Sequence, residues 1–336
     1  MENKLKKGEM TMLRKKKRKI IRKIKNLISV LAFFGVLLYF VAPHIPYLDN
    51  LLAKEAISET IETVSTGEAK DFMENIKDDM LDVTNPMNEK LPVVSKPLPN
   101  KNELVVSYID VGQGDSVLIQ LGDKAMLVDG GQNDKGTTVQ HYLTKMGVNK
   151  LDVLISTHGD ADHSGGLDVI AYKFDIDKCY MSYLDHDTKT YQEFKNVIAE
   201  KGVPVEYPLT NDSFKFGDAD VIFVAPNEGE EETNLASLAF VLKYGDCTYF
   251  FGGDNEKVSY DGKVDVMMCP HHGSYTGNDI EEDYDFSYAV ISVGENEYGH
   301  PHDTTMRLLS EKDCEIFRTD NGTVVSRCDG DIITFE

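Results

Sequence analysis

The pattern of hydrophobic and polar residues divides the 336-residue chain into three zones. Residues 26–48 contain no Asp, Glu, Lys or Arg and form one long apolar stretch. Residues 49–100 are acidic, show a partly helical spacing of apolar residues, and end near the proline-containing run LPVVSKPLPNKNE. From Leu104 onward, short β-rich apolar runs are separated by Gly and Asp. We therefore expect a globular domain at 101–336, preceded by an apolar segment and a linker.

The apolar stretch at 26–48 predicts a transmembrane helix. At about 1.5 Å per residue it is long enough to cross a hydrocarbon layer of roughly 30 Å. Residues 1–25 carry twelve Lys and Arg against two Glu, so the positive-inside rule predicts a cytoplasmic tail and a domain outside the cell membrane. The alternative is a cleaved signal and a secreted product, although Phe40-Val41-Ala42 followed by Pro43 is a poor cleavage site. The prolines favour an extended stalk at 49–100.

The runs from Leu104 onward predict an α/β domain. Several, such as LDVLISTH and CTYFFGGD, are continuous apolar runs that end in a polar or metal-binding residue, which is typical of strands buried on both faces. Helical spacing at 138–147 and 191–202 places helices between the strands. We expect two layers of β-sheet covered by helices.

One strand-end motif, THGDADHSGG at 157–166, points to metal chemistry. His158, Asp160, Asp162 and His163 follow a predicted buried strand directly. Buried charge is costly unless it is paired or bound to a metal. Imidazole nitrogen and carboxylate oxygen together suit zinc, manganese or iron. A polar loop at the end of a strand is the alternative for this motif taken alone.

Further metal-binding residue types follow other predicted strands. Asp254 ends the run TYFFGGD, and His271 and His272 end the run VDVMMCPHH. His300 lies in a later loop, GHPH. Six of the nine histidines thus lie at strand ends or in adjacent loops, which scattered core histidines would not produce. We expect these side chains to converge on one metal centre.

Charge and cysteine content limit the classes of site and substrate that the chain can have. The net charge is −22 overall and, with the basic tail set aside, −32 for the rest of the chain. Such an acidic surface repels polyanions at long range, so an anionic substrate must be captured locally by the metal. The five cysteines show no CxxC spacing, which excludes the usual zinc-finger and thioredoxin sites. We expect buried cysteines, with pairing of Cys314 and Cys328 an option outside the cell.

The motifs together resemble a known family. Their order is DVGQGDS (110–116), LVDGG (127–131), THGDADHSGG, NxxS (234–237), GGD (252–254), HHGS (271–274) and GHP (299–301). This order resembles the metallo-β-lactamase-like hydrolase domain of the ComEC/Rec2 competence proteins, over nearly all of residues 104–336. The resemblance implies a four-layer αβ/βα sandwich and a metal-dependent hydrolase, proposed in the competence proteins to degrade a DNA strand. Asp160 replaces the second histidine of the superfamily form HxHxDH, which makes manganese a competitor to zinc.

The resemblance also implies a ligand set for two divalent metal ions. His158 and Asp160 would bind the first ion, and Asp162 and His163 the second. Asp254 would bridge the two ions, and one of His271 or His272 would complete the set.

Other motif residues are expected around the ions. Asp129 would orient ligands, with capping of local amides as the alternative. Loop residues of three motifs would face the substrate, and the first motif could instead form a plain hairpin. They are Gln113, Asp115 and Ser116 of DVGQGDS, Asn234 and Ser237 of NxxS, and Ser274 of HHGS. Asn234 and Ser237 could instead orient the bridging carboxylate. His300 would contact a phosphate or donate a proton.

The predicted reaction is hydrolysis of a phosphate ester by metal-activated water. Asp162 or Asp254 would accept the proton, and His300 or a histidine of the HHGS pair would protonate the leaving group. The substrate would be DNA, a nucleotide or a cell-envelope polymer, and the sequence indicates no protein partner. One alternative is hydrolysis of a carboxylic ester, thioester or lactam by the same fold. Another is a non-catalytic, metal-binding protein of the cell envelope.

Overall fold

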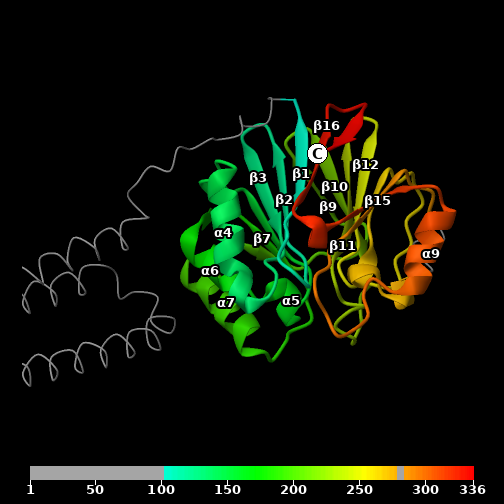
Figure 1. Cartoon of the computed structure of the whole chain (residues 1–336). Helices are drawn as coiled ribbons and strands as arrows, with labels where there is room; N and C mark the ends of the chain where they lie inside the picture. Colours follow the sequence, from blue (N-terminus) through cyan, green and yellow to red (C-terminus); the bar gives the residue numbers. More distant parts are fainter. Residues whose placement is uncertain (1–101, 278–283) are drawn as a thin grey trace, which may run out of the picture. The chain divides into compact units, whose positions relative to one another are not determined.

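The computed structural model describes residues 102–277 and 284–336, which all lie in a compact unit, Pro92–Glu336. Two β-sheets pack face to face, and helices cover their outer faces (Figure 1). This confirms the prediction of an α/β domain with two sheet layers covered by helices. The predicted tail, anchor and stalk at 1–25, 26–48 and 49–100 lie outside the described residues. Within the described ranges, no helix combines the length and apolar character needed to cross a membrane.

The first sheet has eight strands in the order β17-β16-β1-β2-β3-β5-β7-β8. They are β1 (Leu104–Tyr108), β2 (Val117–Leu121), β3 (Lys124–Val128), β5 (Val153–Ser156), β7 (Cys179–Met181), β8 (Val205–Glu206), β16 (Val324–Cys328) and β17 (Ile333–Phe335). Neighbouring strands from β3 to β8 pair in parallel, with Val128 opposite Ile155. The residues that follow β3 and β5 therefore lie at the same edge of this sheet.

The second sheet has seven strands in the order β15-β14-β13-β12-β11-β10-β9. They are β9 (Ser213–Phe216), β10 (Ala219–Ala225), β11 (Ala239–Tyr244), β12 (Cys247–Phe251), β13 (Val266–Met268), β14 (Tyr288–Ile291) and β15 (Glu315–Arg318). Strands β12 to β15 pair in parallel, with Phe251 opposite Met268. The segments after β12 and β13 therefore leave the sheet side by side.

Helices cover both sheets. The helices α4 (Gly136–Lys145), α5 (Ala161–Ser164), α6 (Leu167–Lys173) and α7 (Lys189–Glu200) follow strands of the first sheet, and α9 (Asp303–Glu311) lies against the second (Figure 1). α4 and α7 confirm the helices predicted at 138–147 and 191–202. α7 buries Tyr191, Phe194 and Ile198, a spacing that places all three on one helical face. The shorter elements are β4 (Lys150–Leu151), β6 (Asp175–Ile176), and the 3-10 turns η2 (Asn133–Lys135), η3 (Pro270–Gly273), η4 (Tyr275–Gly277) and η5 (Thr319–Asn321).

The hydrophobic core forms three layers. The central layer lies between the sheets and includes Phe240 and Phe251, whose stacked rings are 4.7 Å apart. A second layer lies between the first sheet and its helices, and a third lies between the second sheet and α9. Burial of these apolar surfaces is the main term that stabilises such a fold.

A disulfide joins the two sheets. It links Cys247, the first residue of β12, to Cys328, the last residue of β16. The pairing of Cys314 with Cys328 considered from the sequence is therefore wrong, because Cys328 is bonded to Cys247. Cys314 follows α9, and its thiol donates to the Leu309 carbonyl instead.

Candidate metal centre

The predicted metal-binding residues come together where the two sheets meet. His158 and His163 follow β5 of the first sheet, whereas Asp254 follows β12 of the second. The turn before Asp254 requires glycine, because Gly253 has a φ of +52° and a Cβ there would lie 2.4 Å from Ser237 Oγ. The pair His271 and His272 follows β13, next to β12 in the same sheet.

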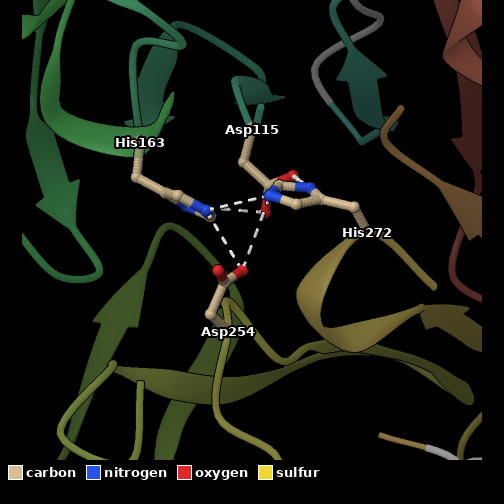
Figure 2. Close-up of side chains that lie close together, drawn as sticks. All are labelled: Asp115, His163, Asp254 and His272. Carbon is tan, nitrogen blue, oxygen red and sulfur yellow. Dashed lines mark hydrogen bonds and ion pairs between the residues drawn. The ribbon is translucent and has the colours of Figure 1, made fainter. Parts of the chain in front are cut away.

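Four buried side chains form the centre of this site: Asp115, His163, Asp254 and His272 (Figure 2). Each offers a ligand atom, and these atoms all lie within 4.8 Å of one another. They come from the β1–β2 loop, the motif after β5, and the segments after β12 and β13. A close approach carries Asp115 into the site, since a Cβ on Gly114 would lie 2.3 Å from the Asp162 carbonyl oxygen.

His163 presents a lone pair to the centre. Its Nδ1 lies 2.9 Å from Asp129 Oδ2, and a carboxylate can only accept a hydrogen bond. In the neutral imidazole the hydrogen is therefore on Nδ1, and Nε2 carries a lone pair. That lone pair faces Asp254 Oδ1 at 3.1 Å and the Nε2 atom of His272 at 3.3 Å.

His272 follows the same logic. Its Nδ1 donates to the Ser292 carbonyl oxygen at 3.0 Å, so its Nε2 is also a lone pair. This Nε2 lies 3.3 Å from Asp162 Oδ2 and 3.8 Å from Asp254 Oδ1. Asp115 contacts the opposite side of the ring, with Oδ1 3.2 Å from Nδ1. Asp162 is therefore better placed than Asp115 to share a cation with His272.

The other oxygen of Asp254 faces a second group of nitrogens. Asp254 Oδ2 lies 3.8 Å from His158 Nε2 and 3.7 Å from His271 Nε2. Asp160 Oδ2 lies 3.7 Å from His158 Nε2. The two oxygens of Asp254 thus point to two different sets of possible ligands.

The buried carboxylates of the cluster favour a bound cation. Burial alone would lower the pKa of His272, but the Asp254 and Asp115 carboxylates outweigh it and raise the pKa to about 10. The same balance raises the pKa of His163 well above its usual value. Burial would raise the pKa of Asp254, yet the His163 and His272 imidazoles hold it well below its usual range. Protons compensate the carboxylates in the metal-free protein, and a divalent metal ion can replace them.

Asp129 is fully buried and contacts the site from behind. Its Oδ1 accepts the backbone N–H of Thr157 at 2.8 Å, and its Oδ2 accepts the Thr157 hydroxyl at 2.6 Å. Together with the bond from His163, the side chain both caps a local amide and orients an imidazole, so the two roles considered from the sequence occur together.

The remaining predicted residues lie at different distances from the centre. Ser237 Oγ accepts the N–H of Asp254 at 3.3 Å and lies 3.4 Å from His158 Nδ1. The Ser116 hydroxyl donates to the Asp129 carbonyl oxygen, and Ser116 is fully buried. Gln113 is buried, and its Oε1 accepts the backbone N–H of Gly294 at 3.5 Å. Asn234 is partly exposed, and its backbone oxygen accepts the N–H of Ser237.

Two predicted residues lie next to the histidine pair. The Ser274 hydroxyl is hydrogen-bonded to that of Thr276. The ring of His300 lies 5.3 Å from that of His271, and its Nδ1 is buried without a hydrogen-bond partner among the described residues. Burial and the nearby His271 and His272 rings lower the pKa of His300. Asn296 holds the loop, because its Oδ1 accepts the N–H groups of residues 298, 299 and 300.

The structure adds site residues that the sequence reasoning missed. They are Thr157, His186, Glu256 and Ser292, each of which contacts a predicted ligand or its partner. Thr157 was detectable, because it stands next to His158 within the motif. His186 and Glu256 stand in polar loop segments with no motif of their own, and Ser292 acts through its backbone oxygen.

Comparison with known proteins agrees with this geometry. A model of the metallo-beta-lactamase superfamily matches residues 109–292. ComE operon protein 3 of Bacillus subtilis is 29% identical over 68% of this chain and 34% of its own length. Competence protein ComA of Neisseria gonorrhoeae is 25% identical over 66% of this chain and 31% of its own length. The chain thus spans about a third of these relatives.

Among solved structures, one of the similar chains is also a metallo-beta-lactamase fold protein. The metallo-beta-lactamase fold protein YhfI from Bacillus subtilis has a TM-score of 0.47 and 15% sequence identity, covering 70% of this chain and 100% of YhfI. The match to the family model includes the motif after β5, Asp254 and both histidines of the pair. The chain therefore belongs to the metallo-beta-lactamase superfamily of metal-dependent hydrolases, and its sequence is similar to those of ComE operon protein 3, competence protein ComA and Recombination protein 2.

Proposed function

We propose that this protein hydrolyses phosphodiesters with two divalent metal ions, zinc or manganese, held on the two sides of Asp254. The observation that carries the proposal is the arrangement of imidazole lone pairs, with His163 and His272 facing Oδ1 and His158 and His271 facing Oδ2. We call these the inner and the outer ion position. Asp162 would add a ligand to the inner position and Asp160 to the outer position.

Two bound ions would activate water and neutralise the non-bridging phosphate oxygens. The chain's own residues would orient the reaction. Asp129 would hold His163 in the tautomer that presents Nε2 to an ion, and Ser292 would do the same for His272. Asp162, whose side chain is 27% exposed, would accept the proton of the attacking water from the solvent side of the site.

His300 would contact the substrate. It lies beside the outer position, where its Nδ1 atom has no hydrogen-bond partner among the described residues. A phosphate oxygen or the leaving-group oxygen would satisfy this nitrogen. Its lowered pKa favours the neutral ring, which can still donate a hydrogen bond to the leaving oxygen.

The relatives' names support a nucleic-acid substrate. One is named a competence protein, and another is Recombination protein 2 of Haemophilus influenzae. We therefore rank DNA first among the substrates, ahead of nucleotides and envelope polymers. The acidic chain would rely on its ions to hold the phosphate locally.

We further propose that the domain works outside the cell membrane, tethered by a helix at 26–48 with its N-terminus in the cytoplasm. The disulfide between Cys247 and Cys328 supports this location, because such bonds persist mainly in oxidising compartments.

A substrate panel tests the activity. The full chain, purified in detergent and loaded with manganese or zinc, is assayed on bis-p-nitrophenyl phosphate, single-stranded DNA and nitrocefin. We expect hydrolysis of the first two, abolished by EDTA and lowered roughly 10²- to 10⁴-fold in Asp162→Asn, while Asp134→Asn on the surface remains active. Turnover of nitrocefin alone, or full activity of Asp162→Asn, would contradict the proposal.

A further inference from the structure

The two sides of Asp254 differ in burial. The side chains of His163 and His272 at the inner position are 0% and 1% exposed. At the outer position, His158 is 1% exposed, but His271 and Asp160 are 25% and 37% exposed. Asp162, the proposed carboxylate of the inner position, is 27% exposed, so each position reaches solvent, but two ligands are exposed at the outer position and one at the inner position.

The contacts of His158 indicate that the outer position can also bind a cation. The Thr157 hydroxyl gives its hydrogen to Asp129, so its oxygen accepts the Nδ1–H of His158 at 3.1 Å. The remaining Nε2 is a lone pair, buried, and without a hydrogen-bond partner among the described residues. It faces only carboxylate oxygens, at 3.7 and 3.8 Å. Ligand atoms of a tetrahedral zinc ion lie roughly 3.3 Å apart, so a small inward shift would close this set around an ion.

His186 contacts the outer position as a donor. Its Nδ1 accepts the backbone N–H of Thr188 at 3.3 Å, which places the ring hydrogen on Nε2. That hydrogen points to Asp160 Oδ1 at 3.0 Å and leaves Oδ2 turned toward His158. Glycine at 159 permits the approach, since a Cβ there would lie 2.2 Å from the Cβ of His186.

Glu256 plays the corresponding part for His271. Its Oε1 accepts the Nδ1–H of His271 at 2.5 Å and also the hydroxyl of Thr276. The Nε2 of His271 is then a lone pair directed to Asp254 Oδ2. Both histidines of the pair have positive φ, 49° and 56°, a conformation that is unusual for residues other than glycine. This backbone turns the neighbouring rings toward different oxygens of Asp254.

From these contacts we infer that the two ions are held unequally: a retained inner ion, and an exchangeable outer ion whose site depends on the positioning residues His186 and Glu256. This inference rests on the two-ion arrangement of the proposed function. Both histidines of the pair are then ligands, one for each ion. Outer partners of metal ligands commonly change metal affinity 10- to 100-fold, so the effect is large enough to measure.

Metal stoichiometry provides the test. The full chain in detergent is loaded with manganese, passed over a desalting column with and without a weak chelator, and its metal content is measured. We expect two ions per chain before chelation and one afterwards. His186→Ala and Glu256→Ala should weaken the second binding event about 10- to 100-fold in calorimetry and leave the first unchanged. In His186→Gln the side-chain amide can replace the Nε2–H, so this variant should recover most of the affinity for the outer ion.

A spectroscopic readout separates positioning from simple structural damage. Two manganese ions bridged by a carboxylate are magnetically coupled, so the wild type should give a coupled electron paramagnetic resonance spectrum and His186→Ala a single-ion spectrum. His141→Ala, on the exposed face of α4, is the matched control and should behave as the wild type. A wild type that binds one ion, or a His186→Ala variant that keeps both ions at unchanged affinity or loses both, would overturn the inference. If two ions bind as expected but no phosphodiester is cleaved, the proposed function fails and the inference stands.

Discussion

The carboxylate of Asp129 accepts the Nδ1–H of His163 at 2.9 Å, and both side chains are completely buried. This contact decides which nitrogen of His163 faces the metal centre. In Asp129→Asn the side-chain amide can donate to Nδ1, which would move the ring hydrogen to Nε2 and remove the lone pair. We expect metal affinity to fall about 10- to 100-fold, measured by competition with a chromogenic chelator.

The exposed Asp134, changed to Asn, is the control for Asp129→Asn, because it removes the same charge away from the site. A variant with unchanged metal affinity and an unchanged melting temperature would show that Asp129 serves only to cap the Thr157 amide.

Metal binding should release protons. The carboxylates of the cluster raise the pKa of His272 to about 10 and also raise that of His163, so the pair holds at least one extra proton at neutral pH without metal. A metal ion needs the neutral rings, so binding at the inner position should release protons, and apparent affinity should rise with pH. Calorimetry in buffers of different ionisation enthalpy counts these protons. An enthalpy independent of the buffer would contradict the expected protonation, and His141→Ala should release as many protons as the wild type.

The disulfide should stabilise the domain strongly. It closes a loop with a sequence separation of 81 residues, for which the chain-entropy estimate gives an upper value of about 4.5 kcal/mol. The double variant Cys247→Ser/Cys328→Ser should lower the free energy of unfolding by up to this amount, measured by urea titration. Dithiothreitol should destabilise the wild type and leave the double variant unaffected. Equal destabilisation of both proteins by dithiothreitol would show that the effect of the reductant does not come from the Cys247–Cys328 bond.

Gly159→Ala should affect the outer ion without touching a ligand. The added Cβ would lie 2.2 Å from the Cβ of His186, so the loop that carries His186 must move and its contact with Asp160 is lost. We expect the metal content after weak chelation to match that of the wild type, with weaker binding of the second ion. Gly202→Ala, where nothing lies within 4 Å of the added Cβ, is the steric control, although its φ of +65° makes a small loss of stability expected.

Much of the fold could be predicted from the sequence because the buried strands are continuous apolar runs. The run after Leu151 contains β5, and its end delivers His158 to the edge of the sheet, as the motif suggested. Where the carboxyl ends of parallel strands lie together, residues distant in the chain converge. The αβ/βα layering followed from the family resemblance, and the three core layers match it.

The rest of the site depends on backbone geometry that leaves no local signal. His271 and His272 are identical residues in sequence, and their rings reach different oxygens of Asp254 through a positive-φ turn and through separate partners, Glu256 and Ser292. The His186 loop reaches the motif through a contact permitted by Gly159, which reads in sequence as an ordinary turn residue. The partner of Cys328 could not be chosen either, because Cys247 and Cys314 both adjoin strands of the opposite sheet and no local pattern separates them.

Strand β12 carries a cross-link to the other sheet at each of its ends. Cys247 begins the strand and is bonded to β16, while Asp254 follows its last residue and faces the histidines that come after β5. A domain that is both reduced and stripped of metal would lose the two strongest of these links and keep the apolar core and a few hydrogen bonds, such as that from the Leu238 N–H to the Thr157 carbonyl, between the halves of its sandwich. If the domain works outside the membrane with bound metal ions, as proposed, its final rigidity would depend on both oxidation and metal supply.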